Sequence, residues 1–198
     1  MRTVSVVTAA LLACALAGCA ETPSPASSPD SSAPPAPSAT TTPVVEVFAL
    51  PDECEAILPA ARLDEFADEG LVLLGGPGGT YGDEYLGEPS PEQDAGGITC
   101  IWGPPDTEVS SIAISVAPLS AATRPAIVAD LADNQGLNET TGNGITLYWQ
   151  LGDRQLQPAI LNALTADSWI SIIRTMGGID SYTLAESIAA EVHDAVYS

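Results

Sequence analysis

The sequence predicts an α+β domain: an antiparallel sheet of about five strands with helices packed on one face, and one disulfide. Apolar and polar residues alternate over several short segments, which is the pattern of half-buried strands. Turn residues such as Gly, Pro, Asn and Asp separate these segments by short intervals, which favours hairpins and therefore antiparallel pairing. Segments with helical signals precede, separate and follow the strands.

Residues 1–18 have the features of a bacterial lipoprotein signal peptide. Arg2 supplies a positive charge, and the apolar run that follows ends in Leu16-Ala17-Gly18-Cys19. A run of about 14 residues is too short to span a bilayer as a helix, which needs about 20. We therefore expect a mature chain that begins at a lipid-modified Cys19, anchored to the extracytoplasmic face of the cell membrane. The alternative is an ordinary secretory signal followed by a chance cysteine.

Residues 19–48 are expected to form a tether that starts at the lipidated cysteine and is rich in Pro, Ser, Ala and Thr. This composition has no hydrophobic periodicity and cannot bury a core, so it predicts a disordered, semi-extended spacer. At about 3.1 Å per residue, the reach of the tether is about 85 Å at most. Residues 49–198 are then of the size of a single globular domain with one core.

The domain is expected to begin with two helical segments. Asp52 and Glu55 have the spacing of a capping pattern at the start of a short turn. Pro59 suits the first turn of a second helix, over residues 59–68, and Gly70 suits its end.

A long loop rich in Gly and acidic residues follows, over residues 70–97. Residues 71–74 within it are apolar and suit a short strand. The Gly75–Gly79 tract has the composition of a phosphate-binding loop, but the chain has no lysine to complete one. Long loops are often functional. The residues of this loop that we expect to contact a partner are Tyr81, Asp83, Glu84 and Tyr85.

Five segments have the alternation of half-buried strands. Ile112, Ile114 and Val116, for example, occupy every second position. Turn residues fold the last three segments into a meander. The five segments are residues 98–102, 109–117, 145–151, 156–164 and 168–174.

Two helices complete the prediction. One begins at Thr123 and Pro125 and stops near Gly136. The other begins at Thr183, where Glu186 completes a capping box, and its apolar stripe predicts one buried face.

Cys54 and Cys100 are predicted to form a disulfide. Loss of the signal peptide removes Cys14 and lipidation uses Cys19, so two thiols are left to pair in an oxidising compartment. Closing a loop of this length stabilises a fold by about 4 kcal/mol in the chain-entropy model. Two distant thiols and the single His193 do not make a metal site, so no metal and no other cofactor is expected.

The chain is strongly acidic, with 26 Asp and Glu residues against 5 basic ones and a formal net charge of −21. Such a surface repels phosphate backbones and anionic lipid headgroups, which disfavours nucleic-acid binding and electrostatic membrane docking. Solubility of an exposed domain explains this charge more simply than a cation-binding role.

The sequence offers little for catalysis, and no catalytic residue is predicted. His193 falls on the polar side of the last predicted helix, and no nucleophile motif accompanies it. Asp83, Glu84 and Glu88 are the nearest approach to the pair of carboxylates that a glycosidase needs. The tryptophans are expected in the sheet core, with an apolar cleft between sheet and helices as the alternative.

Two short cysteine motifs complete a pattern that also includes the lipobox and the Pro/Ser/Thr spacer. They are Cys54-Glu55-Ala56-Ile57-Leu58-Pro59, before a helix, and Cys100-Ile101-Trp102, at the end of a strand. With these motifs the chain resembles a group of actinobacterial cell-envelope lipoproteins of unknown function, over most of residues 50–198. The resemblance implies a disulfide and a surface location, and it implies no reaction.

The sequence therefore predicts a membrane-anchored lipoprotein that acts as a non-catalytic binding module of the cell envelope. Its expected partner is an envelope protein or a wall component. The alternative is a carrier or sensor of a small apolar ligand, a lipid or a peptide, held between sheet and helices. A carboxylate-based hydrolase ranks third.

Overall fold

The computed structural model describes residues 47–107 and 109–197. The predicted signal peptide (1–18), Cys19 and all but the last two residues of the predicted tether (19–48) lie outside the described residues. Near the start of the described chain, Phe48 forms an isolated antiparallel bridge with Tyr197, and their ring centroids lie 5.7 Å apart. The beginning of the described chain is therefore held against its end.

A single antiparallel sheet runs through the described residues, with its strands in the order β1-β2-β3-β7-β6-β5-β4. The α+β class and the antiparallel sheet are confirmed, but the sheet has seven strands rather than about five. The strands are β1 (Val72–Gly75), β2 (Ile98–Gly103), β3 (Ile112–Pro118), β4 (Asn138–Gly142), β5 (Ile145–Gln150), β6 (Ala159–Leu164) and β7 (Ser168–Arg174).

The two additional strands are the edges of the sheet, β1 and β4. β1 lies at the apolar residues 71–74 of the predicted loop, which suit a short strand. β4 was missed because all five of its residues are exposed, so it carries no apolar alternation. Backbone pairing with β5 holds β4 in place, and a pattern search based on burial does not detect such a strand.

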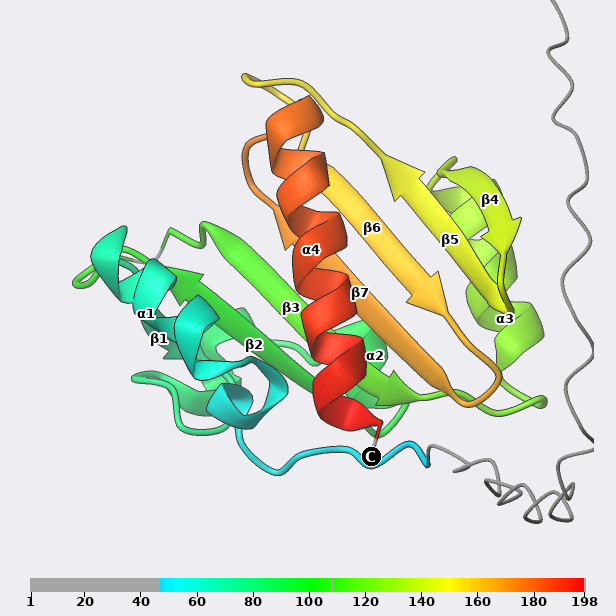
Figure 1. Ribbon diagram of the computed structural model, residues 1–198, viewed down its shortest axis with the longest axis horizontal. Helices are drawn as coiled ribbons and strands as arrows, with labels where there is room; N and C mark the ends of the chain where they lie inside the picture. Colours follow the sequence, from blue (N-terminus) through cyan, green and yellow to red (C-terminus); the bar gives the residue numbers. More distant parts are fainter. Residues whose placement is uncertain (1–46, 108, 198) are drawn as a thin grey trace, which may run out of the picture. The chain divides into compact units, whose positions relative to one another are not determined.

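Helices lie on both faces of the sheet, not on one as predicted (Figure 1). The first face, here called the α4 face, carries η1 (Cys54–Ile57), α1 (Ala60–Asp68) and α4 (Ile179–Val196). The second, here called the α2 face, carries η2 (Gly82–Leu86), α2 (Pro91–Asp94), α3 (Arg124–Ala129) and the π-helical turn η3 (Asp130–Asn134).

The main core lies on the α4 face. α4 packs its buried Ala185, Ile188 and Val192 against β6 and β7, whose buried residues include Leu161 and Ile172. This helix begins at Ile179, four residues before the predicted Thr183. Gly178, with φ of 99°, precedes the first turn, so the Thr183–Glu186 capping pattern lies inside the helix rather than at its start.

The predicted disulfide is confirmed: Cys54 and Cys100 are bonded, with their Cα atoms 5.5 Å apart. Both cysteines are fully buried in the α4-face core. Gly76 lies directly over this bond, because a Cβ added to it would stand 2.2 Å from the Thr99 carbonyl oxygen and 2.7 Å from Cys54 Sγ. The glycine tract thus permits close packing over the disulfide.

The predicted long loop at 70–97 is structured. After β1 it forms η2 and then α2, whose start is a capping box that sequence reading missed. Ser90 Oγ accepts from the Gln93 backbone N–H, and Gln93 Oε1 accepts from the Ser90 backbone N–H. Pro91 occupies the first turn, where its missing N–H has no intrahelical role. With these contacts at its start, α2 packs on β2 and β3.

Candidate functional site

A row of buried polar side chains crosses the α2 face. Its members stand directly opposite one another in the strand register and are between 2% and 5% exposed. Tyr148 of β5 continues the row, and its hydroxyl is hydrogen-bonded to Glu139 at the sheet edge. We call the buried part the polar row: Thr99 (β2), Ser115 (β3), Ser171 (β7) and Asn162 (β6).

Hydrogen bonds connect the polar row to its surroundings. Ser90 Oγ lies 2.6 Å from Thr99 Oγ1, which lies 2.9 Å from Ser115 Oγ. At the other end of the row, Trp169 Nε1 donates to Asn162 Oδ1 at 2.9 Å. A buried polar group without such partners costs about 1–3 kcal/mol of stability. These hydrogen bonds therefore offset the cost of burying the polar row.

Glu92 lies over the polar row and is the most unusual side chain of the domain. It is 7% exposed, although it belongs to a helix of only four residues. Its carboxyl group is hydrogen-bonded to the Ser171 and Ser90 hydroxyls. No ion pair within residues 47–107 and 109–197 includes it. Burial raises the pKa of the Glu92 carboxyl above its ordinary value, and the hydrogen bonds offset part of that rise.

A second row, two residues along each strand, is apolar. It consists of Ile101 (β2), Ala113 (β3), Ile173 (β7) and Ile160 (β6), again in direct register. A pocket of about 320 Å³ lies over both rows, and we call it the Glu92 pocket. Its walls are formed by η2 and α2 on one side, by η3 on the other, and by Trp169. The wall residues are Leu86, Ser90, Pro91, Glu92, Leu131 and Gln135.

This pocket has the composition of a small-molecule site. It combines apolar walls with a few convergent polar groups, and its volume is at the lower end of the range for ligand pockets, about 300–1,000 Å³. Leu86 and Ile173 are 44% and 39% exposed and mark the mouth. A buried carboxyl group whose pKa is raised, in such a setting, is a recognised sign of a functional site.

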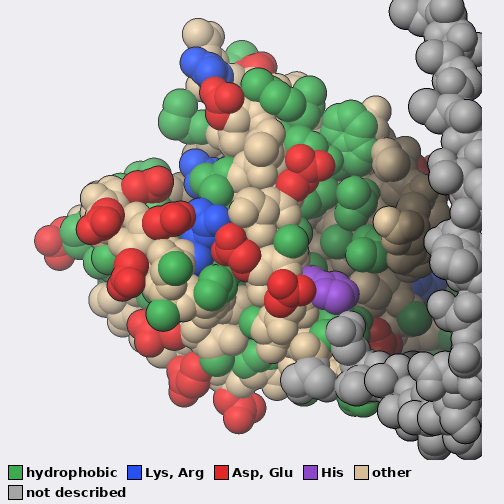
Figure 2. Space-filling view, viewed as in Figure 1, with side chains coloured by type: hydrophobic (Ala, Val, Ile, Leu, Met, Phe, Trp, Pro, Cys, Tyr) green, Lys and Arg blue, Asp and Glu red, His purple; other side chains and the backbone are tan. Residues whose placement is uncertain are grey.

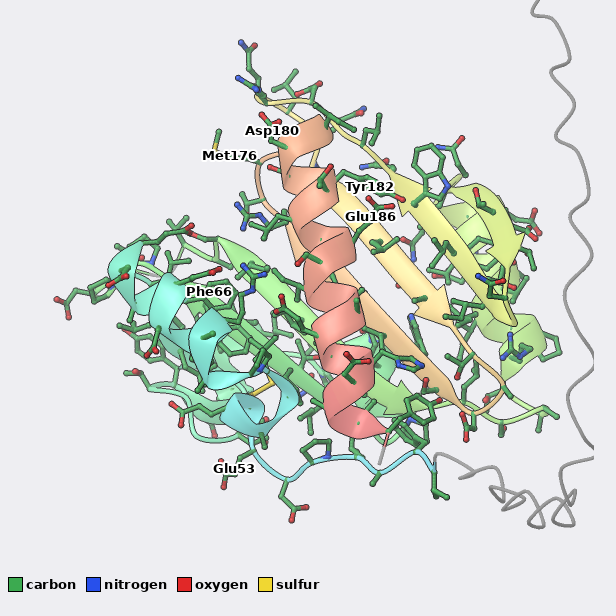
Figure 3. All side chains as sticks on the ribbon, viewed as in Figure 1. Glu53, Phe66, Met176, Asp180, Tyr182 and Glu186 are labelled. Atoms are coloured by element: carbon green, nitrogen blue, oxygen red, sulfur yellow. A yellow bond between two sulfur atoms is a disulfide. The ribbon has the colours of Figure 1, made fainter. Side chains whose placement is uncertain are left out.

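A second hollow, of about 310 Å³, lies on the opposite face along the flank of α4. Figure 2 shows hydrophobic side chains gathered beside α4 over β5, and in Figure 3 Tyr182 and Glu186 project from this flank. The floor of this α4 groove is apolar, with Ile145 and Leu147 of β5 half-buried. Its polar lining residues are all at least partly exposed. The α4 groove is a strip of sheet that α4 leaves uncovered, without the buried polar groups of the Glu92 pocket.

The predicted partner loop lies on the surface, outside the Glu92 pocket. Tyr81, Asp83 and Glu84 are exposed, while Tyr85 is half-buried and its ring packs against Gly75. None of the four lines the pocket. The same loop nevertheless contributes Leu86 to the pocket mouth.

The other sequence candidates do not assemble into a site. Glu88 is exposed, and neither it nor Asp83 nor Glu84 lines any of the hollows described above. His193 stacks on Tyr197, with ring centroids 4.5 Å apart, and its Nδ1 lies 3.8 Å from an Asp194 carboxylate oxygen.

Sequence reading missed Glu92 and the polar row for one reason. The predicted fold has helices on one face only, which leaves the strand residues opposite the core in solvent, but α2, η2 and η3 cover them. A signal was present: the positions are Thr, Ser, Ser and Asn, which are small and uncharged. A solvent-facing strand surface in so acidic a chain would be expected to carry charges.

No three His, Cys, Asp or Glu side chains gather as a potential metal site within the described ranges. None of the helices there has the length and apolarity to cross a membrane. Comparison of the chain with protein-family models, with curated proteins and with solved structures finds no match.

Proposed function

We propose that this chain is a lipid-anchored envelope lipoprotein whose globular domain binds a small ligand in the Glu92 pocket. One observation carries the proposal: a buried carboxyl without an ionic partner stands over a hydrogen-bonded polar row at the wall of an open pocket. Burying a carboxyl group without an opposite charge costs free energy, which its hydrogen bonds offset only in part, and a ligand with a matching group would offset more of it. Of the two binding roles expected from the sequence, this observation favours the ligand carrier or sensor, with a ligand that is part polar rather than wholly apolar.

The pocket supports binding better than hydrolysis. A glycosidase-type reaction uses two carboxyl groups about 5–10 Å apart, and the lining residues include one, Glu92. No histidine, cysteine or lysine accompanies it there. The pocket thus offers recognition groups, with neither a second carboxyl group nor an imidazole, thiol or amine beside Glu92.

The loop that forms the pocket mouth is the second candidate site, for a protein or wall component. Tyr81 is 45% exposed and lies against Tyr85, with ring centroids 6.0 Å apart, next to the exposed Asp83 and Glu84. An exposed aromatic residue with flanking charges is a common anchor at interfaces. Because this loop continues directly into Leu86, a partner bound here would lie close to the ligand.

Native mass spectrometry of the full chain, extracted gently from its own membrane without reductant, tests the ligand proposal. We expect a discrete added mass beyond the covalent lipid. Two matched variants show which of the two hollows holds the bound ligand. Ala113→Leu narrows the Glu92 pocket, and Ala190→Leu narrows the α4 groove. Loss of the added mass in the first variant alone is the expected result. Loss in the second variant alone would place the ligand in the α4 groove and contradict the proposal.

The lipid anchor has its own test. A Cys19→Ala variant is expected to be released from the membrane fraction, because acyl chains on Cys19 are the proposed attachment. Cys14→Ala is the matched control, since it also removes one thiol, and it should leave the protein bound. Retention of the Cys19→Ala variant on the membrane would contradict the anchor.

A further inference from the structure

The hydroxyl protons of the polar network have a direction that follows from Glu92. An ionised carboxylate only accepts hydrogen bonds, so Ser90 and Ser171 both donate to it. Ser90 Oγ has then used its one proton and accepts from Thr99, besides the Gln93 backbone N–H. Thr99 has likewise used its proton and accepts from Ser115.

The consequence is that four hydroxyl groups direct their protons along the network toward Glu92, and none toward the pocket. What these groups offer a ligand is lone pairs, together with the carboxylate itself. The Asn162 side chain accepts from Trp169 through its oxygen, which leaves its amide N–H group as the hydrogen-bond donor of the polar row. A ligand that fits this wall is mainly a donor.

The charges around the pocket also favour a hydrogen-bond donor, and one that is positively charged. Glu92 is the one titratable side chain among the lining residues, and no Arg, Lys or His lines the pocket. Asp94 and Asp130 line an adjoining hollow on the same face. The arginine of this face, Arg124 of α3, interacts with Tyr148, which is not a lining residue. The net charge of −21 adds a long-range field that attracts cations and repels anions.

We propose that the Glu92 pocket binds an organic amine, with its ammonium group on the Glu92 carboxylate and its apolar substituent on the apolar row. The inference rests on the proposed function, and it names the ligand class. An ammonium group supplies hydrogen-bond donors to the lone pairs of the pocket wall. It also supplies a positive charge, which no side chain lining the pocket provides to Glu92. The volume of about 320 Å³ suits a substituent of the size of a single ring.

The test uses two probes of one shape, benzylamine and benzyl alcohol, titrated calorimetrically into the full chain at neutral pH. Benzylamine is expected to bind about tenfold more tightly or better, because a charge-assisted hydrogen bond in a buried site is stronger than a neutral one. Glu92→Gln should abolish this preference while leaving benzyl alcohol binding in place, which also shows that the variant is folded. Glu55→Gln makes the same change at an exposed position of η1 and should keep the preference.

A measurement on the unaltered chain gives a second readout. The affinity for benzylamine should rise over the pH range in which Glu92 loses its proton, since the alkylamine keeps its own charge there. The affinity for benzyl alcohol should not rise in this range. This holds whether or not the Glu92→Gln variant folds.

The outcomes separate the two proposals. Equal binding of both probes, or a preference for benzylamine that survives in Glu92→Gln, overturns the amine inference and leaves the pocket as a site for neutral ligands. Failure of both probes to bind at millimolar concentration overturns the small-ligand function along with it.

Discussion

The two faces of the sheet are built on opposite principles. On the α4 face, side chains such as Ile114 and Ile172 are fully buried and apolar, and the disulfide lies among them. On the α2 face, the same strands present Ser115 and Ser171, also buried but hydrogen-bonded, beneath Glu92. One set of strands therefore carries a dry core on one side and a polar, hollowed surface on the other.

The two faces thus differ in packing density and in the polarity of their buried side chains. Close apolar packing contributes to stability, and a cavity in such packing lowers the free energy of unfolding. A polar row with a buried carboxyl contributes less and keeps an open volume beside it. The α4 face is thus the densely packed side of the sheet, and the α2 face is covered by short helices and loops with a pocket between them.

The disulfide is the strongest test of the α4 face. Replacing Cys54 and Cys100 together by alanine removes a bond between residues 46 positions apart, and the loss expected from chain entropy is about 4 kcal/mol. Urea unfolding of the full chain measures it, with reduced wild-type protein as the matched comparison. A loss below about 1 kcal/mol would mean that the covalent bond adds little to this core.

Truncation of a matched pair of isoleucines compares the two faces directly. Ile188→Ala, on the buried side of α4, should lower the free energy of unfolding by about 3 kcal/mol, because it leaves a cavity. Ile173→Ala, 39% exposed at the mouth of the Glu92 pocket, should lower it by about 1 kcal/mol or less. Equal losses from urea titrations would contradict the contrast between a dense face and a hollow one.

Glu92 gives the α2 face a pH dependence of opposite sign to that of an ion-paired carboxylate. Burial raises the pKa of Glu92 in the folded state, so the unfolded chain loses this proton at lower pH than the folded chain does. The contribution of Glu92 to stability is complete below its ordinary pKa and is lost as the pH rises through the folded-state pKa. The stability of wild type relative to Glu92→Gln should therefore fall over that range.

Thermal unfolding of both proteins, from pH about 4 to about 7, measures this difference. Glu88→Gln makes the same change at an exposed position and should show no such pH-dependent difference. Parallel curves for wild type and Glu92→Gln would mean that Glu92 ionises without a penalty in the fold.

The smallest effects on stability are expected at the exposed loop beside the pocket. Tyr81→Ala and Asp83→Asn should change the free energy of unfolding by about 0.5 kcal/mol or less, because both side chains are exposed. If the loop is a partner site, the same substitutions should weaken cross-linking to that partner in intact cells. Unchanged cross-linking in both variants would remove the loop from consideration. Point substitutions are needed, since deleting residues 75–95 would also remove Glu92.

Much of the α4 face was predictable. The alternation of Ile112, Ile114 and Val116 identified a strand and its buried side, and elimination among the cysteines identified the disulfide. The α2 face was not, because its strand residues are polar and a helix of four residues covers part of them. Glu92 was visible as one acid of a Gly-rich loop, and its burial depends on the capping box at Ser90 that places α2 on the sheet.

The α+β class, the central strands, the disulfide and the strong negative charge follow from the amino-acid sequence alone, because local patterns or composition indicate each of them. The tertiary structure decided the edge strand β4, the covering of both faces and the position of Glu92 over the polar row. The physical reason is that a period of two tells which side chains share a face of a sheet. It does not tell what packs on that face, or which residues of distant strands stand opposite one another.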